Sequence, residues 1–546
     1  MRTILPLFLF LFGYYPIFAQ NKPYTLADTL RGMLRPERTC YDVKYYELRV
    51  DIDFVRKSIK GLNKIEYMTT TGANMLQIDL FANMRIDKIL HQGKICKYHR
   101  KHNAVFVDLG EIQPANVRDS LLVYFSGKPT SAIRPPWDGG FSWEKDEKGR
   151  DWLGVACEGL GASVWFPNKD YLGDEPDSVR IIATVPKPLV CVSNGVLRGK
   201  QEDKKKITYD WFVSYPINNY NITLNVGHYL HFSDTFVSTI DSQKLALDYY
   251  VIDYNKEVAE AQFKETHTTL RVMEKYLDKY PFWNDGFALV ETHYLGMEHQ
   301  GAIAYGNKFM KGYRGMFPIG MPFDYIIMHE AAHEWWGNSI GCKDHAELWI
   351  HETFTTYMES VYVEEVYGAA KTDEYFKYQV GNIANTQPMI GDLDVNYNEH
   401  NSDIYYKGAL MLHTLRTSVN NDSIWWGLLK TFYQKHAMSQ IVTQTVVDFV
   451  NEYLQADYTV FFKQYLYQTT VPTLQYKLKQ KGDKVEISAK FKNALPNFSL
   501  KVGIFNQNSL EVLDTNTEKW ANLTIKNANV RDIKLKMGLY RVEFLD

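Results

Sequence analysis

Alternating polar and apolar positions dominate the first 230 or so residues of the chain. Residues 46–54 (YELRVDIDF), 119–125 (DSLLVYF) and 177–185 (DSVRIIATV) each show a two-residue period, which is typical of strands with one buried face. Proline, glycine, asparagine and aspartate punctuate the sequence between them. The pattern predicts antiparallel sheets, packed as a saddle or sandwich, over residues 21–232.

The spacing of apolar residues then changes to a helical period. Residues 255–281 have apolar side chains at helical intervals and end at a proline. A short strand-like segment, 286–294, follows, and helical spacing returns in 348–368 and 408–420. These features predict a mainly helical domain over residues 233–472.

Strand patterns return in the last part of the chain, within 473–491, 498–507 and 534–546. The Lys-Gly-Asp sequence at 481–483 predicts a hairpin turn. These residues suffice for one small β-sandwich over 473–546. The resulting order of β, α and β domains agrees with the about three domains expected for 546 residues.

The composition is that of an ordinary globular protein, with 45% hydrophobic and 23% charged residues. The formal net charge of −3 gives no reason to expect nucleic acid or an anionic surface as a partner. The five cysteines are too few and too scattered to indicate a disulfide framework or a zinc ribbon.

Residues 1–20 have the features of a cleaved secretory signal. Arg2 precedes an apolar stretch over 4–18, and Ala19 follows it with a small side chain. A membrane anchor is the alternative, but the stretch is short and contains two prolines and a glycine. We expect a periplasmic or secreted protein that has no stable membrane insertion once the signal is removed.

A His-Glu-x-x-His motif occurs at His329, Glu330 and His333. Residues four apart lie on one face of a helix, so the two imidazoles can share one metal ion. Glu330 lies beside the first histidine, where a carboxylate can reach a metal-bound water. The apolar sequence FDYIIM at 323–328 favours a buried helix over a solvated helix with two incidental histidines. We therefore predict one Zn²⁺ per chain.

A third protein ligand must come from outside the motif. Glu352 is the main candidate, because eighteen residues separate it from His333 and they include glycines that can end one helix and let the chain turn back. His345, in the predicted loop, is an alternative. So is His351, which would point about 100° away from Glu352 on their shared helix.

These residues resemble the gluzincin zinc aminopeptidases, the family of membrane alanyl aminopeptidase and leukotriene-A hydrolase. Two histidines, eighteen residues and a glutamate form the zinc pattern of that family, although it commonly has Asn and Gly where this chain has His351 and Thr353. The resemblance implies an N-terminal β saddle, a thermolysin-like catalytic domain and a small C-terminal β-sandwich. It also implies a shorter, bacterial-type member without the helical-repeat domain of larger members.

The sequence LGMEHQ resembles the Gly-x-Met-Glu-Asn exopeptidase motif of the same family. Leu295 replaces its Gly and His299 replaces its Asn, whereas Met297 and Glu298 match. The resemblance implies that Glu298 binds the free α-amino group of the substrate, with Gly296 and Met297 beside it. An ordinary loop acid near a strand is the alternative.

Two further segments resemble the family around its site. In IYYKGALML, Tyr405 lies 53 residues after Glu352 and matches a tyrosine that can donate to the oxyanion. The following Lys-Gly pair favours Tyr405 over Tyr406. Glu158 stands where the family often has a glutamine that contacts the substrate amine. The alternative is that Glu158 lies in an ordinary surface loop and has no role in the site.

We therefore expect a zinc aminopeptidase that acts on peptides with a free N-terminus. Glu330 is the expected general base and Tyr405 the expected oxyanion donor. One alternative is a catalytically silent member of the family that binds peptides or acts as a scaffold. The other is an epoxide hydrolase that uses the same site.

Overall fold

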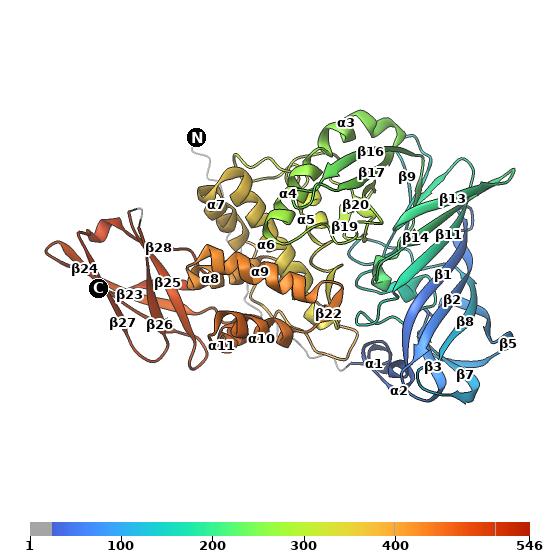
Figure 1. The fold of residues 1–546 in the computed structure, drawn as a ribbon, viewed down its shortest axis with the longest axis horizontal. Coiled ribbons are helices and arrows are strands. Elements are labelled where there is room, and N and C mark those ends of the chain that lie inside the picture. The colour runs from blue at the N-terminus through green and yellow to red at the C-terminus, as the bar shows by residue number, and fades with distance from the viewer. Residues whose placement is uncertain (1–23, 398, 508, 546) are drawn as a thin grey trace, which may run out of the picture.

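Residues 24–397, 399–507 and 509–545 are described by a computed structural model of the chain. Three regions follow one another along its longest axis, with N-terminal sheets at one end, helices in the centre and C-terminal strands at the other end (Figure 1). The predicted order of β, α and β regions is therefore confirmed. The signal predicted for residues 1–20 lies outside the described residues. No helix within the described part of the chain is long and apolar enough to cross a membrane.

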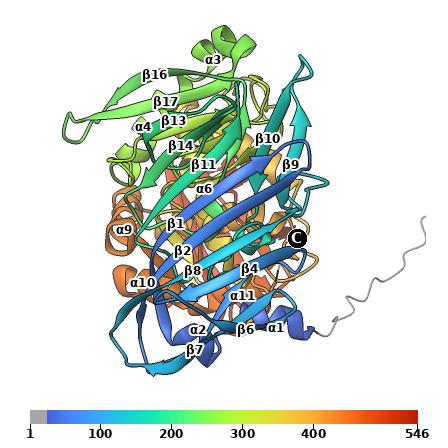
Figure 2. The same ribbon diagram turned by 90° about the vertical axis from the view of Figure 1, so that its right-hand side faces the viewer.

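An eight-stranded sheet forms the outer face of the N-terminal region (Figure 2). Its strands in spatial order are β13 (Val196–Glu202), β14 (Lys206–Val213), β11 (Ser178–Pro186), β1 (Tyr41–Asp53), β2 (Ser58–Thr69), β8 (Arg118–Gly127), β4 (Met84–His91) and β5 (Lys94–Ile95). The expectation of antiparallel pairing is wrong at one place, because β1 and β11 are parallel. The long chain segment between these two strands lets the second one enter the sheet in the same direction.

Two smaller sheets and two short helices complete this region. One sheet contains β3 (Ala73–Asp79), β7 (Ala104–Gln113) and β6 (Lys97–Lys101), and the other contains β12 (Val190–Val192), β15 (Asn225–Gly227), β10 (Asp151–Ala156) and β9 (Gly140–Lys145). The helices are α1 (Leu26–Gly32) and α2 (Pro36–Thr39). The loop that follows β10 carries Glu158 toward the central region.

The central region begins with a five-stranded sheet, in the order β16 (Tyr229–Val237), β17 (Lys244–Ile252), β18 (Phe287–Glu291), β20 (Ile303–Tyr305) and β19 (Gly296–Met297). The domain boundary expected after residue 232 falls inside β16, which pairs with β17 from Tyr229 to Val237. The whole strand therefore belongs to this sheet. The division of the chain into domains otherwise stays a prediction. The edge strand β19 carries two of the residues expected in the substrate site.

Nine α-helices occupy the rest of the central region in the described chain. They are α3 (Lys256–Gln262), α4 (Glu265–Tyr276), α5 (Tyr325–Ala332), α6 (Trp349–Tyr367), α7 (Ala369–Val380), α8 (Tyr406–Val419), α9 (Asp422–His436), α10 (Thr443–Leu454) and α11 (Thr459–Tyr467). The short strands β21 (Ile340–Cys342) and β22 (Ser439–Ile441) pair with each other and so link the segment after α5 to the segment after α9. The short 3-10 turns of the chain are η1 (Ala162–Val164), η2 (Asn219–Asn221), η3 (Asp253–Asn255), η4 (His345–Glu347), η5 (Ser402–Ile404) and η6 (Val530–Asp532).

Helix α6 is the central element of this region. The helix predicted at 348–368 is confirmed, and Gly368 follows it with a φ of +88°, a conformation that suits glycine. Residues 349–363 are all buried, so the helix is covered on every side. It packs against α5, α7 and α8, which lie around it in Figure 1.

The C-terminal region consists of two packed sheets. One contains β27 (Ala521–Lys526), β24 (Lys484–Lys492), β23 (Thr473–Lys481) and β29 (Arg541–Phe544), and the other contains β26 (Ser509–Asn516), β25 (Ser499–Asn506) and β28 (Ile533–Leu535). Lys481 pairs with Lys484, so a two-residue turn joins β23 to β24 as predicted. Gly482 supplies the positive φ, +61°, that such a turn requires.

The contact between α6 and α8 leaves no room for a side chain at Gly408. A Cβ atom at this position would lie 1.8 Å from Oγ1 of Thr353 on α6. That hydroxyl donates a hydrogen bond to the carbonyl of Ile404 at 2.6 Å, so it cannot turn away without losing its partner. The close approach of these two helices fixes the position of Tyr405 relative to Glu352.

We predict that Gly408→Ala lowers the free energy of unfolding by about 1–3 kcal/mol, because the added methyl group overpacks this contact. Denaturant unfolding measures the loss. Adding Thr353→Gly to this variant should recover most of the lost free energy of unfolding. A double-mutant cycle then separates the coupling between positions 353 and 408 from the low helix propensity of the new glycine. A coupling free energy near zero would contradict the packing argument.

Candidate active site

The start of α5 is fixed by the buried carboxylate of Asp324. It accepts hydrogen bonds from the backbone N–H groups of Ile326 at 3.0 Å and Ile327 at 3.4 Å. The same carboxylate also accepts from the side chains of Gln262, Tyr305 and Asn307 at 2.6, 2.7 and 2.9 Å. An eight-residue helix is not stable alone, so these contacts and its burial position the residues at its end.

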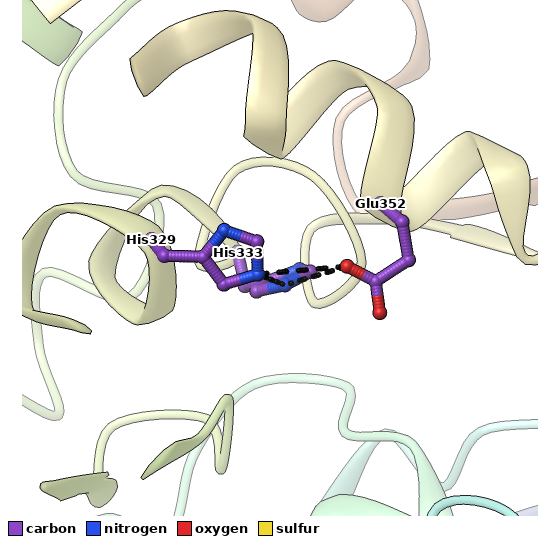
Figure 3. Close-up of side chains that lie close together, drawn as sticks. All are labelled: His329, His333 and Glu352. Carbon is purple, nitrogen blue, oxygen red and sulfur yellow. Dashed lines mark hydrogen bonds and ion pairs between the residues drawn. The ribbon is translucent and has the colours of Figure 1, made fainter. Parts of the chain in front are cut away.

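His329 and His333 project from the end of α5 toward Glu352 in the first turn of α6 (Figure 3). One carboxylate oxygen, Oε2 of Glu352, lies 3.6 Å from Nε2 of His329 and 3.4 Å from Nε2 of His333. The two Nε2 atoms are 3.2 Å apart. The structure thus brings together the three residues that the sequence spacing indicates as metal ligands.

These donor atoms fit a tetrahedral zinc ion. Zn–N and Zn–O bonds of about 2.0–2.1 Å place neighbouring tetrahedral ligand atoms roughly 3.3–3.4 Å apart. Oε2 of Glu352 is buried and has no hydrogen-bond partner among the described residues, although it faces two imidazoles. Burial opposes the charge of Glu352, but His333 and His329 outweigh it and hold the pKa of this carboxyl well below its usual range.

The two alternative third ligands make other contacts. His345 begins the turn η4, and its Nε2 lies 3.4 Å from a guanidinium nitrogen of Arg31. His351 accepts a hydrogen bond on Nε2 from the backbone N–H of Cys342 at 2.9 Å. Glu352 is therefore the candidate whose donor atom lies close to both histidines of the motif.

The other ring nitrogen of each histidine contacts a buried acceptor. Nδ1 of His329 lies 2.6 Å from the carboxylate of Glu359, which also accepts from the hydroxyl of Tyr375 at 2.6 Å. Nδ1 of His333 lies 2.9 Å from the carbonyl oxygen of Trp336. An Nδ1–H that donates to such an acceptor leaves Nε2 unprotonated and able to bind a metal.

Glu330 points toward the edge strand β19. A Cβ atom at Gly296 would lie only 2.4 Å from Oε1 of Glu330, so glycine leaves the space that this carboxylate occupies. Burial raises the pKa of Glu330 to about 7. A carboxyl group with such a pKa can both accept and donate a proton near neutral pH.

Glu298 and Glu158 come from different regions of the chain and lie on the wall of the same cavity. A carboxylate oxygen of each and a ring nitrogen of His351 lie within 4.8 Å of one another. Glu298 accepts a hydrogen bond from the hydroxyl of Tyr220 at 3.1 Å, whereas the buried Oε1 of Glu158 has no partner among the described residues. Burial raises the pKa of both carboxyls, and the neighbouring Glu298 raises that of Glu158 further.

Tyr405 contacts two of the candidate metal ligands. Its hydroxyl donates a hydrogen bond to Oε1 of Glu352 at 2.8 Å, and its ring stacks on His329 with the ring centres 6.1 Å apart. Tyr406 lines the same cavity, but Tyr405 makes the contact with the ligand cluster. Tyr405, the expected oxyanion donor, thus touches a metal ligand, whereas the disfavoured Tyr406 only lines the cavity.

The cavity that these residues enclose has a volume of about 430 Å³. Four carboxylates line it, together with Met297 and several aromatic side chains, and none of the described lining residues is Lys or Arg. The carboxylates are those of Glu158, Glu298, Glu330 and Glu352. Such a cavity attracts cations, in particular a metal ion and an ammonium group.

Several residues at the site were not found from the sequence. Glu359 lies seven residues, or two helical turns, after Glu352 and on the same face of α6. This spacing could have indicated from the sequence that Glu359 lies near the metal ligands. Tyr220 and Asn338 support the Glu298 loop, the latter by donating to the Glu298 carbonyl at 2.7 Å. No local pattern links these two residues to position 298.

Comparison with known proteins places these residues in a defined family. Residues 261–465, which include the metal cluster and Tyr405, match the model of the peptidase family M1 domain. The chain carries an M1 peptidase domain. This finding confirms the resemblance to the zinc aminopeptidases and leukotriene-A hydrolase.

Curated relatives of the whole chain are distant. Leucyl aminopeptidase of Saccharolobus solfataricus is 20% identical over 92% of this chain and 63% of its own length. Probable aminopeptidase 1 of Sulfurisphaera tokodaii is 20% identical over 82% of this chain and 55% of its own length. The chain thus spans less than two thirds of the length of either relative. Leukotriene A-4 hydrolase of Xenopus laevis is 22% identical over 77% of this chain and 69% of its own length.

Solved structures share the fold of the M1 domain and its neighbouring regions. Aminopeptidase A of Legionella pneumophila superposes with a TM-score of 0.78 over 93% of this chain and 60% of its own, at 15% identity. An M1 zinc metallopeptidase of Deinococcus radiodurans, solved with a Tyr-Ser-Ala substrate, gives 0.64 over 78% of this chain and 94% of its own, at 18% identity. The predicted multidomain fold class is therefore confirmed.

We predict that Glu359→Gln weakens zinc binding by about 10–100-fold, since His329 loses the charged acceptor that orients it and makes it a stronger ligand. Titration against a competing zinc chelator measures the affinity. Glu365→Gln on the same helix is the matched control, because its carboxylate contacts Lys275 and Tyr276 instead. Equal affinities of the two variants would show that the Glu359 contact does not act on the metal site.

Proposed function

We propose that this protein is a zinc-dependent aminopeptidase that releases N-terminal amino acids from peptides. The observation that carries the proposal is a pair of carboxylates, the buried Glu298 and the half-buried Glu158, beside the His-His-Glu cluster of an M1 domain. An ammonium group bound between them would hold the N-terminus of a peptide at a fixed place relative to the metal. The names of the aminopeptidase relatives agree with this proposal.

His329, His333 and Glu352 would hold one Zn²⁺ per chain, with a fourth position left open. Zinc in such a site supplies a water of lowered pKa and polarises a carbonyl group. The tight contacts of both Nδ1 atoms support this assignment, because they keep each Nε2 atom directed at the same point.

Glu330 acts as the general base in the proposed reaction. Its carboxylate takes a proton from the attacking water and returns it to the nitrogen of the leaving amine. Both transfers require a pKa near the working pH, which burial of this side chain provides. Tyr405 offers a phenolic O–H next to the ligand cluster, and we propose that it donates to the oxyanion as the carbonyl becomes tetrahedral.

Glu298 and Glu158 bind the substrate's α-ammonium group, and Gly296 and Met297 lie beside it. Two neighbouring carboxylates repel each other, so a cation between them removes a repulsion as well as gaining hydrogen bonds. A substrate whose amine is acetylated offers no such cation. The expected export to the periplasm or the medium would place the enzyme where it meets free peptides, and this location is part of the proposal.

We predict that Glu330→Gln retains zinc and loses about 10²–10⁴-fold in turnover, because it removes the proton carrier and keeps the shape of the side chain. Hydrolysis of a fluorogenic amino-acid amide measures turnover, and metal analysis of the same sample measures zinc. Unchanged turnover would refute the role of Glu330. A wild-type protein that binds peptides without cleaving them would instead support the silent peptide-binding alternative.

We predict that Glu298→Ala lowers kcat/KM for peptides with a free amine by about 100-fold, the effect of losing a charge-assisted hydrogen bond. Hydrolysis of N-acetylated peptides should stay at its low wild-type rate. Glu158→Gln serves as the matched variant for the second carboxylate and reports its separate contribution. Equal wild-type cleavage of free and acetylated peptides would indicate an endopeptidase.

A further inference from the structure

Exposed apolar side chains lie on two loops that each contribute a residue to the wall of the active-site cavity. We call them the apolar rim. Their exposed fractions lie between 41% and 89%. The members are Ile133, Trp137, Met316, Phe317 and Ile319.

The rim is continuous with the cavity. Trp137 from one loop and Tyr313 from the other both line the cavity, and Trp137 is at the same time 60% exposed. The guanidinium group of Arg314 lies 5.8 Å from the ring centre of each of them, so it joins the two loops. A chain that leaves the cavity past Trp137 therefore meets apolar surface.

The size of the cavity requires that longer substrates leave it. Its volume of about 430 Å³ lies near the lower end of the roughly 300–1,000 Å³ typical of ligand pockets. The metal ligands and both amine-binding carboxylates already line this space. Only the first few residues of a peptide fit there, so the rest must extend over the mouth.

The charge of the two surfaces differs. Four carboxylates line the cavity, whereas the rim presents aliphatic, thioether and aromatic side chains. Exposed apolar side chains beside a cavity favour the binding of an apolar partner, because their burial against it is favourable. The two surfaces together match a ligand with a cationic end followed by apolar residues.

We propose that the apolar rim binds the residues downstream of the cleaved bond, and that the preferred substrates are peptides with apolar side chains there. This inference rests on the proposed aminopeptidase function. The rim then adds affinity for such peptides without contacting the bond that breaks. Amino-acid amides, which have no downstream residues, make no use of it.

The test compares two pentapeptides that share the first two residues, Ala-Ala-Leu-Phe-Leu and Ala-Ala-Ser-Gln-Ser. Calorimetry on the Glu330→Gln protein measures binding of both without cleavage. We expect the apolar peptide to bind about tenfold tighter, the effect of burying roughly 60 Å² of apolar surface. The double variant Met316→Ser/Ile319→Ser in the same protein should abolish that difference.

The matched control is Val55→Ser/Ile95→Ser, which replaces two exposed apolar side chains of the N-terminal region, one in the turn between β1 and β2 and one in β5. It should keep the tenfold preference. Turnover of an amino-acid amide, measured with Glu330 intact, should be the same in the wild type and in both double variants. If none of the three proteins hydrolyses the amide, the proposed function is wrong. If the Met316→Ser/Ile319→Ser protein still prefers the apolar peptide, the inference is wrong. The inference is also wrong if these substitutions change the oligomeric state and leave peptide binding unchanged.

Discussion

Burial of the charged carboxylate of Glu352 against two histidines is the constraint on which the centre of this protein depends. A charge removed from water costs several kcal/mol unless it is paired and hydrogen-bonded. Glu352 meets that condition through the two imidazoles, the Tyr405 hydroxyl and the metal that its free oxygen atom can bind. The neighbouring elements hold these groups in place.

Helix α6 shows how this requirement shapes the packing. It is buried on all sides, yet it carries threonines, glutamates and a serine that an apolar core could not accept. Two of its polar side chains have specific partners, since Thr353 donates to the Ile404 carbonyl and Glu359 accepts from Tyr375. The first of these partners, Ile404, also lines the cavity. The helix therefore organises the site through hydrogen bonds as well as through apolar contact.

The parts that were predictable from the sequence are the local ones. The spacing of His329 and His333 lies within one helix, and the period of α6 and its terminal glycine are visible in its own residues. The parallel pairing of β1 with β11 was missed because a strand pattern does not say which distant strand it pairs with. The boundary expected after residue 232 falls inside β16 for a related reason, since the pairing of this strand with β17 cannot be read from either strand's own residues. Glu359 was missed because its partner lies on another helix, although its spacing from Glu352 was informative.

The proposed amine-binding place lies at the junction of the N-terminal and central regions rather than in either one. Glu158 follows β10 in the N-terminal region, whereas Glu298 follows β19 in the central sheet. Two hydrogen bonds tie the loop that carries Glu298 to both sides of this junction: Asn338 donates to the Glu298 carbonyl at 2.7 Å and accepts from Asn221 at 2.8 Å. If the amine binds there as proposed, its distance to the metal is set by how the two regions pack. Because that distance decides which peptide bond meets the metal, cleavage after the first residue would be a property of this interface, and a change at Asn221 or Asn338 would act on it without touching substrate.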